Sequence, residues 1–169
     1  MLIELGDITK KSKMEAIVNP ANGVGIMGAG VAGAITTYAG PNVSKEAKEL
    51  VKKRGRPFEA GDAYATGAYR LEKWGVKKIY HAVTMKYPGG LTSVNVVNRA
   101  MRGVIRMALR DGIKSVAFPG LGTGIGRLDK TVVADTMVSV CQQHDHKLEI
   151  KIIDVDRDFI EEIKRHVGV

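Results

Sequence analysis

Two glycine-rich segments carry the residue types and spacing in this sequence that suggest chemistry. Residues 28–33 read GAGVAG, which matches the pattern G-x-G-x-x-G of dinucleotide-binding loops. Residues 120–126 read GLGTGIG, and each segment precedes an expected helix. Glycine lets a backbone approach a ligand closely, and the free N–H groups at a helix start attract anions. Together the two loops predict a site that holds a diphosphate from both sides.

The surroundings of the first loop argue against a dehydrogenase. In a dinucleotide-binding fold the glycine loop follows its strand directly, and the next strand carries an acid for the ribose. Here the preceding strand is expected over residues 15–18, ten positions before Gly28, and the next element is a helix over 45–54. Glu46 and Glu49 therefore lie in mid-helix, and no G-x-x-x-x-G-K-[ST] motif occurs. The sequence favours a phosphate-binding loop of another kind.

Hydrophobic periodicity and turn signals predict alternating strands and helices along the chain. Strands are expected over residues 2–5, 15–18, 62–71, 78–83, 115–118 and 148–153. Helices are expected over residues 31–38, 45–54, 94–111, 130–143 and 157–166. Thr92 or Ser93 is the expected cap of the longest helix, and Asp129 caps the one after it. Since no linker or repeat interrupts this pattern, we predict one α/β domain over residues 1–169.

The net charge is the main functional signal in the composition. Lys and Arg number 26 against 18 Asp and Glu, which gives a formal charge of +8. Such an excess predicts attraction to a polyanionic ligand, namely phosphates, nucleic acid such as RNA, or another anionic polymer. Aromatic residues make up only 5% of the chain, which argues against a stacking platform for single-stranded nucleic acid.

Cysteine and histidine usage argues against a metal site. Cys141 is the only cysteine, so an internal disulfide and a thiolate cluster are excluded, and its apolar neighbours place it in the core. His144 and His146 form the only histidine cluster, and no third ligand lies nearby. We expect no metal and no cofactor. The sequence also shows no membrane span and no signal-peptide core, so we expect a cytoplasmic protein without a membrane partner.

Four ordered segments resemble the macro domain, an ADP-ribose-binding module. They are residues 6–9 (GDIT), 16–22 (AIVNPAN), 28–35 (GAGVAGAI) and 117–126 (AFPGLGTGIG). The resemblance spans nearly the whole chain, and the ordered set is more specific than any single motif. It implies a three-layer αβα sandwich with a mixed central sheet. It also implies ADP-ribose or an ADP-ribosylated protein as the partner.

The resemblance gives roles to two polar residues near strand ends. Asp7, followed by Ile8, matches an aspartate that binds the adenine amino group, a donor that suits an acceptor-only carboxylate. Asn22 matches an asparagine that contacts the distal ribose. From the residues alone, Asp7 is a turn residue and Asn22 an Asx-turn at a strand end, so both interpretations stay open. Asn19 is assigned that structural role.

The resemblance places the other ligand contacts in the two loops and near the last strand. The loops would supply Gly28, Gly30, Val31, Gly120, Gly122, Thr123, Gly124, Ile125 and Gly126. Many relatives carry an aromatic over the distal ribose where this chain has Gly126. Val155 stands where adenine often stacks on an aromatic, and Phe159, one helical turn on, is the expected substitute.

Departures from the family pattern concern catalysis. Ala32 replaces an aspartate that many hydrolytic macro domains carry. The second loop looks more like the branch that removes terminal ADP-ribose from proteins with a lysine and an aspartate. Lys86 lies near the lysine position, whereas Gly126 stands at the aspartate position. His81, expected at a strand end near the site, could act on a distal-ribose substituent. The catalytic candidates are Asn22, His81 and Lys86.

Three functions stay open on this evidence. The first is an enzyme that hydrolyses ADP-ribose derivatives at the distal ribose, namely a protein ester, an O-acetyl group or a 1''-phosphate. A trapped water would attack near Asn22 while the loops position the diphosphate. The second is a non-catalytic module that binds free or polymeric ADP-ribose. The third is RNA binding through the basic segment 45–56.

Overall fold

A central β-sheet organises the structure, which is a computed structural model that describes residues 1–10 and 12–169. Within those residues the strands are β1 (Leu2–Leu5), β2 (Ala16–Asn22), β3 (Ala63–Gly67), β4 (Lys78–Met85), β5 (Ser115–Phe118) and β6 (Glu149–Asp154). They lie in the order β1-β6-β5-β2-β4-β3, and each neighbouring pair is parallel except β3 and β4. The predicted mixed sheet is confirmed.

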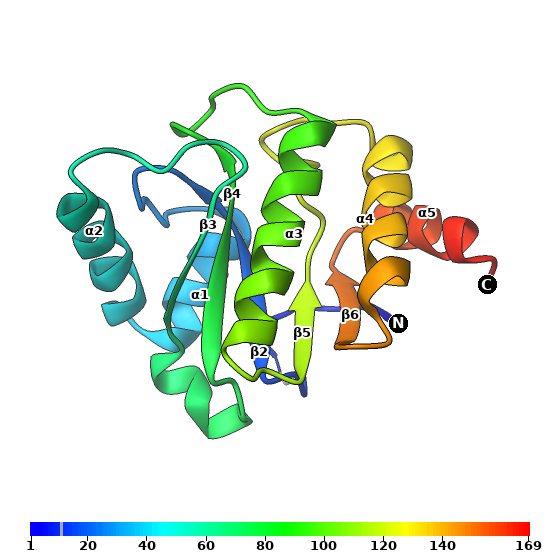
Figure 1. Ribbon diagram of the computed structural model, residues 1–169, viewed down its shortest axis with the longest axis horizontal. Coiled ribbons are helices and arrows are strands. Elements are labelled where there is room, and N and C mark those ends of the chain that lie inside the picture. The colour runs from blue at the N-terminus through cyan, green and yellow to red at the C-terminus, as the bar shows by residue number, and fades with distance from the viewer. Residues whose placement is uncertain (11) are drawn as a thin grey trace.

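Helices cover both faces of the sheet, which confirms the three-layer αβα arrangement (Figure 1). One face carries α1 (Gly30–Ala39), α2 (Asn42–Arg54) and the short 3₁₀ helix η1 (Tyr69–Trp74). The other carries α3 (Val94–Arg110), α4 (Lys130–His144) and α5 (Arg157–Val167). None of the helices in the described part of the chain combines the length and apolar character needed to cross a membrane.

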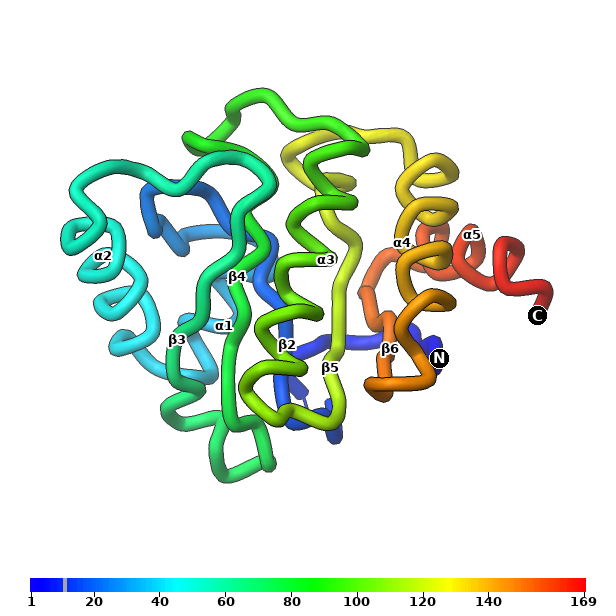
Figure 2. Tube along the Cα trace, in the orientation of Figure 1, coloured from blue at the N-terminus to red at the C-terminus, as the bar shows by residue number. Residues whose placement is uncertain are grey.

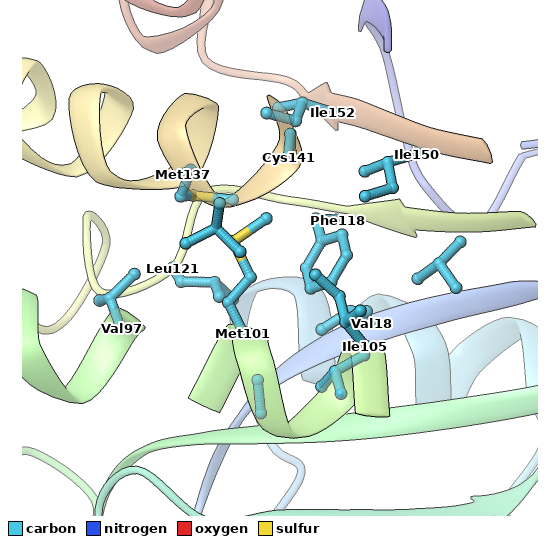
Figure 3. Close-up of a cluster of buried hydrophobic side chains, with 14 of the residues drawn as sticks. Val18, Val97, Met101, Ile105, Phe118, Leu121, Met137, Cys141, Ile150 and Ile152 are labelled. Atoms are coloured by element: carbon cyan, nitrogen blue, oxygen red, sulfur yellow. The ribbon is translucent and has the colours of Figure 1, made fainter. Parts of the chain in front are cut away.

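Successive side chains of the inner strands point to opposite faces of the sheet, and this divides the core into two clusters. On β2, Ile17 packs in the cluster under α1 and α2, whereas Val18 packs in the cluster under α3, α4 and α5. Figure 3 shows part of the second cluster, where Met101 of α3 and Phe118 of β5 meet. Cys141 lies there as expected, and burial raises the pKa of its thiol to about 12. Because both faces are covered, inner strands are buried on both sides.

Capping residues set the helix starts that the sequence predicts best. Ser93 begins α3 by accepting a hydrogen bond from the Val96 amide, and Asp129 begins α4 by accepting from the Thr131 and Val132 amides. The last residues of α3 and α4 lie within one position of the predicted ends. Strands β1 and β5 have the predicted bounds.

Two strands, β2 and β3, differ from the predicted bounds by more than two residues at one end. β2 continues through Pro20 to Asn22 instead of ending at Val18. β5 pairs with β2 only as far as Ile17, so Pro20 has a ladder partner on one side alone, an edge-like position that tolerates proline. The strand predicted over 62–71 stops at Gly67, and η1 takes up the rest.

The longer β2 weakens one argument against a dinucleotide-binding fold and leaves the other intact. Gly28 follows the true end of β2 by six positions instead of ten. However, α2 follows α1 directly, so no second strand brings an acid to a ribose. The exclusion therefore rests on the order of the elements.

Candidate functional site

A pocket of about 380 Å³ lies where the carboxyl ends of several parallel strands meet. We call it the loop pocket, because most of its wall comes from the two glycine loops. Its lining residues are Pro20, Ala21, Asn22, Ile26, Gly28, Ala29, Gly30, Val31, Ala32, Thr84, Met85, Pro88, Gly120, Gly122, Thr123, Gly124, Ile125, Gly126, Asp154 and Asp156. The structure thus brings together the predicted residues of both loops and Asn22.

The first wall of the loop pocket is the start of α1. Ala29, its N-cap, makes no side-chain cap, and the first turn contains no acidic residue. The amides of Gly30, Val31 and Ala32 precede the first intrahelical bond, from Gly33 N–H to the Ala29 carbonyl, and so lack helical partners. These amides and the positive end of the helix dipole form a neutral binding site for an anion.

The second wall is the loop after β5, which is anchored at its base. The Gly120 amide donates to Asp154 Oδ2 at 2.8 Å, and the Leu128 amide donates to the Gly122 carbonyl at 2.9 Å. A Cβ on Gly120 would lie 2.8 Å from Thr123 Oγ1 and 2.9 Å from Phe159 Cε1, so only glycine fits the present packing. The anchored base fixes the loop across the pocket from α1.

Gly126 shows why this loop carries no aromatic at that position. A Cβ there would lie 2.7 Å from the Gly122 carbonyl oxygen and 2.8 Å from Thr92 Cγ2. The backbone therefore has no room for a larger side chain, and Ile125, which is 66% exposed, supplies the apolar surface of the loop tip. The apolar side chain at the tip of this loop is therefore aliphatic and not aromatic.

Asn22 lines the loop pocket and also holds its own loop together. Its Oδ1 accepts from the amides of Val24 and Ile26, both at 3.2 Å, and its Nδ2 donates to the Ile26 carbonyl at 2.9 Å. The next amide, that of Gly23, donates to the Met85 and Lys86 carbonyls. The side chain thus makes the turn-forming bonds that the sequence allowed for, at a position that a ligand can reach.

His81 lies away from the loop pocket, which corrects its expected place at a strand end near the site. It stands in the middle of β4, completely buried, with Nδ1 3.1 Å from Asn19 Nδ2 and Nε2 2.9 Å from Thr66 Oγ1. Its ring stacks on Tyr64 at 4.6 Å between centroids. Burial lowers the pKa of His81 to about 3, so the ring is neutral at physiological pH. Its position is that of a packed core residue.

Lys86, Asp7 and Ile8 also lie outside the pocket lining. Lys86 is half exposed and pairs with Glu59 at 3.1 Å, so the structure gives it no desolvated setting. Asp7 Oδ1 accepts from the amide and hydroxyl of Thr9, and Ile8 beside it is buried.

Val155 and Phe159, the two residues expected near the adenine, also lie outside the lining, for opposite reasons. Phe159 is fully buried, because it is on the inner face of α5 and packs beneath Gly120. Its ring therefore supports the loop from below and presents no face to a base. Val155 is 73% exposed and sits between the two lining residues Asp154 and Asp156.

Two carboxylates in the lining were missed by the sequence analysis. Asp154, the last residue of β6, accepts from the amides of Gly120 and Asp156. Asp156 caps α5 and pairs with Lys130 at 2.7 Å, and this hydrogen bond lowers the pKa of the Asp156 carboxyl. The signal was available, since Asp154 directly follows the strand predicted over residues 148–153 and precedes a predicted helix. Among the described residues, no group of three or more His, Cys, Asp or Glu side chains could hold a metal ion.

The chain is similar to known proteins over most of its length. A family model described as the Macro domain matches residues 18–137. An uncharacterized protein of Aquifex aeolicus (strain VF5) is 35% identical over 97% of this chain and 95% of its own length. The O-acetyl-ADP-ribose deacetylase 1 of Pantoea vagans (strain C9-1) is 35% identical over 80% of this chain and 77% of its own length.

A solved structure shows the same fold. The Oceanobacillus iheyensis macrodomain, in a glycine-to-valine variant with ADPR, has a TM-score of 0.86 with 23% identity. The alignment covers 98% of this chain and 90% of that one. Given the family match over most of the sequence and the shared fold, this chain belongs to the macro domain family.

Proposed function

We propose that this chain binds ADP-ribose in the loop pocket and hydrolyses ADP-ribose derivatives at the distal ribose. The observation that carries the proposal is the uncapped start of α1, which faces the anchored loop 120–126 across the pocket. The Oceanobacillus iheyensis macrodomain with ADPR and the Pantoea vagans deacetylase support this ligand class. The substrates would be O-acetyl-ADP-ribose, ADP-ribose 1''-phosphate or an ADP-ribosylated protein.

The diphosphate would lie between the two loops. Its charge meets the free amides of the first turn of α1, where no side-chain carboxylate competes for them. The amides of Thr123, Gly124 and Ile125 make no hydrogen bond within the described residues and are available from the other side. Fixed backbone donors of this kind need no rearrangement when the anion binds.

The two ends of the ligand would meet Asp7 and Asn22. Asp7 Oδ1 is held by Thr9, whereas Oδ2 has no partner among the described residues and can accept the adenine amino hydrogen. Asn22 lines the loop pocket at the end of β2, where the distal ribose would lie. The loop that Asn22 holds would keep its amide in place beside the sugar.

Hydrolysis in this pocket would depend on how the pocket positions the substrate and the attacking water. Asp154 and Asp156 are the ionisable side chains in the lining, and both are occupied by amides or by Lys130. Ala32 presents only a methyl group where an acid would serve as a base. General acid–base catalysis typically contributes about 10²–10⁴ in rate, so we expect slow turnover by a water held near Asn22.

A second candidate function is binding without turnover. The same observation favours it, because a pocket lined by Ala32 and two occupied carboxylates can hold a diphosphate without supplying a base. Under this alternative the chain would recognise free or polymeric ADP-ribose.

Calorimetry and product analysis separate these functions. ADP-ribose, AMP and NAD are titrated first, and we expect ADP-ribose to bind most tightly because it alone presents both a diphosphate and a free distal ribose. O-acetyl-ADP-ribose, ADP-ribose 1''-phosphate and a mono-ADP-ribosylated protein are then incubated with the chain. Loss of any one supports hydrolysis, whereas survival of all three leaves the binding function. If ADP-ribose fails to outcompete AMP, both functions are wrong.

A further inference from the structure

A second, larger groove of about 680 Å³ lies between α3 and residues 55–62, the segment that leads into β3. Figure 2 shows this segment running beside α3. We call it the arginine groove, because it is lined by Arg54, Arg99, Arg102, Arg106 and Arg110. It shares no lining residue with the loop pocket, and the function proposed above makes no use of it.

Most of the positive charge in the arginine groove is not neutralised. Asp62, the only acid in the lining, pairs with Arg54 at 3.6 Å, and Arg110 lies 3.6 Å from Asp111. Within the described residues, the other three arginines have no carboxylate within 4 Å. Arg102 instead donates to two neutral side-chain oxygens, those of Asn98 and Gln143. Like charges on successive turns of a helix repel one another, so an anion bound along this surface would relieve the repulsion.

The arginines of α3 form a line. They recur at intervals of three, four and four residues, which places about one in each turn, opposite the buried face of the helix. The line is roughly 16 Å long at about 1.5 Å of rise per residue. One nucleic-acid strand in a duplex carries a charge about every 3.4 Å, so several consecutive phosphates fit along it. Guanidinium groups bind phosphate oxygens in pairs, which favours this partner over scattered carboxylates.

Two glycines give the groove a floor of backbone. Gly103 lies within α3, and a Cβ there would be 3.3 Å from the Cβ of Ala63 on β3. Gly61 has φ +98°, and its Cβ position is 2.8 Å from Arg99 Cζ, so the guanidinium lies across the Gly61 backbone. The close approach of α3 to this segment therefore leaves the arginines as the rim of a channel.

Phe58 is the aromatic residue in the lining, and its ring is already covered. Tyr64 stacks on it with centroids 4.3 Å apart, and the Arg54 guanidinium lies 4.7 Å from the ring centroid. The ring offers no open face to a nucleobase, so contacts in the groove are made to phosphates and not to bases.

We propose that the arginine groove binds the sugar–phosphate backbone of a nucleic-acid strand without reading its sequence. The inference is independent of ADP-ribose binding, since the two sites have separate linings. It also differs from attraction by the basic helix α2, because the unpaired arginines lie on α3. The net charge of +8 would assist the encounter.

The test measures fluorescence anisotropy of labelled single-stranded DNA, its RNA equivalent and the duplex DNA, each of about 16 nucleotides. The variant Arg99→Gln/Arg106→Gln removes two positive charges from the arginine groove. The control Lys52→Gln/Lys53→Gln removes the same charge from exposed positions on α2. Thermal melting of all proteins verifies that each variant is folded.

We expect the groove variant to lose at least about tenfold in affinity at low salt, with the salt slope on single strands reduced by about 1.4. The control should lose less than about twofold, because charges outside the contact are screened. The three oligonucleotides identify the form of nucleic acid preferred. Equal losses in both variants, displacement of the oligonucleotide by ADP-ribose, or stronger competition by polyglutamate than by unlabelled DNA would each overturn the proposal.

Discussion

The loop pocket and the arginine groove both suit phosphate, yet they are built from opposite materials. The pocket presents backbone amides and glycines, and its charged side chains are two carboxylates, Asp154 and Asp156. The groove presents five guanidinium groups on long side chains. Fixed amides select an anion by shape and need little rearrangement when it binds. Mobile cationic side chains attract any polyanion, and its counterions are released on binding. The net charge of +8 therefore says little about how the loop pocket would hold an anion.

The largest expected effect comes from placing a charge on the neutral wall of the pocket. We expect Val31→Asp to weaken ADP-ribose binding by about 100-fold or more, because a like charge facing the diphosphate costs several kcal/mol. Its thermal stability should not fall, since an acid in the first turn of a helix is stabilising by about 0.3–1 kcal/mol. Calorimetry and thermal melting measure the two effects.

The neutral variant Val31→Asn is the matched control for this change, because it has the same shape without the charge. It should lose far less affinity. Equal losses in the two variants would mean that the wall acts by shape and not by its field.

Salt should divide the two regions next. Between about 50 and 200 mM salt, the affinity of the arginine groove for a single strand bound through about four phosphates should fall roughly 50-fold. Binding of ADP-ribose to backbone amides should change by less than about threefold, because it neutralises few counterions. Parallel titrations by anisotropy and calorimetry measure both slopes. Similar salt slopes for the two ligands would mean that the pocket and the groove bind phosphate in the same way.

A substitution at Asn22 tests the role of this side chain in the loop pocket. We expect Asn22→Ala to lower the rate of O-acetyl-ADP-ribose hydrolysis about tenfold while changing ADP-ribose affinity less, because misplacement of a reacting group costs rate first. Single-turnover kinetics and calorimetry measure the two quantities.

A second substitution at this position separates its roles. Asn22→Asp keeps Oδ1, which accepts from the Val24 and Ile26 amides, and loses the Nδ2 donor. If the aspartate variant hydrolyses as fast as the native protein, the side chain serves only to hold its loop.

The smallest effect is expected at Asp7. Asp7→Ala should weaken ADP-ribose binding by about fivefold, near the 1 kcal/mol of one net hydrogen bond, and leave a diphosphate ligand without a base unaffected. Competition calorimetry with both ligands tests this. An unchanged affinity for ADP-ribose would remove Asp7 from the site.

The sequence predicts the framework well where signals are local. Ser93 and Asp129 mark helix starts through their own hydrogen bonds, and the glycine loops mark the strand-to-helix junctions that form the pocket. Position along the chain alone predicts that Phe159 and His81 lie in the site. Packing decides otherwise: the inner face of α5 turns Phe159 into the core, and β4 carries His81 between Asn19 and Thr66.

The arginine groove could not be predicted from runs of charge. The segment 45–56 is a dense basic stretch and is the basis of the RNA-binding hypothesis. The arginines of α3 are spread among apolar residues, and only helical spacing collects them on one side. Gly61 lies in the connection before β3 and Gly103 lies in α3, so the groove depends on a contact between distant parts of the chain that no local pattern contains.

The double hydrogen bond of the Gly23 amide has a consequence for chemical durability. An asparagine followed by glycine loses its side-chain amide over time when the glycine backbone nitrogen attacks the side-chain carbonyl carbon (Cγ) of the asparagine. At Asn22 this attack is hindered, because the Gly23 N–H is held by the Met85 carbonyl at 3.0 Å and the Lys86 carbonyl at 2.9 Å. Folding thus preserves the residue nearest the proposed chemistry, and mass spectrometry should show deamidation at Asn22 rising sharply once the chain is unfolded.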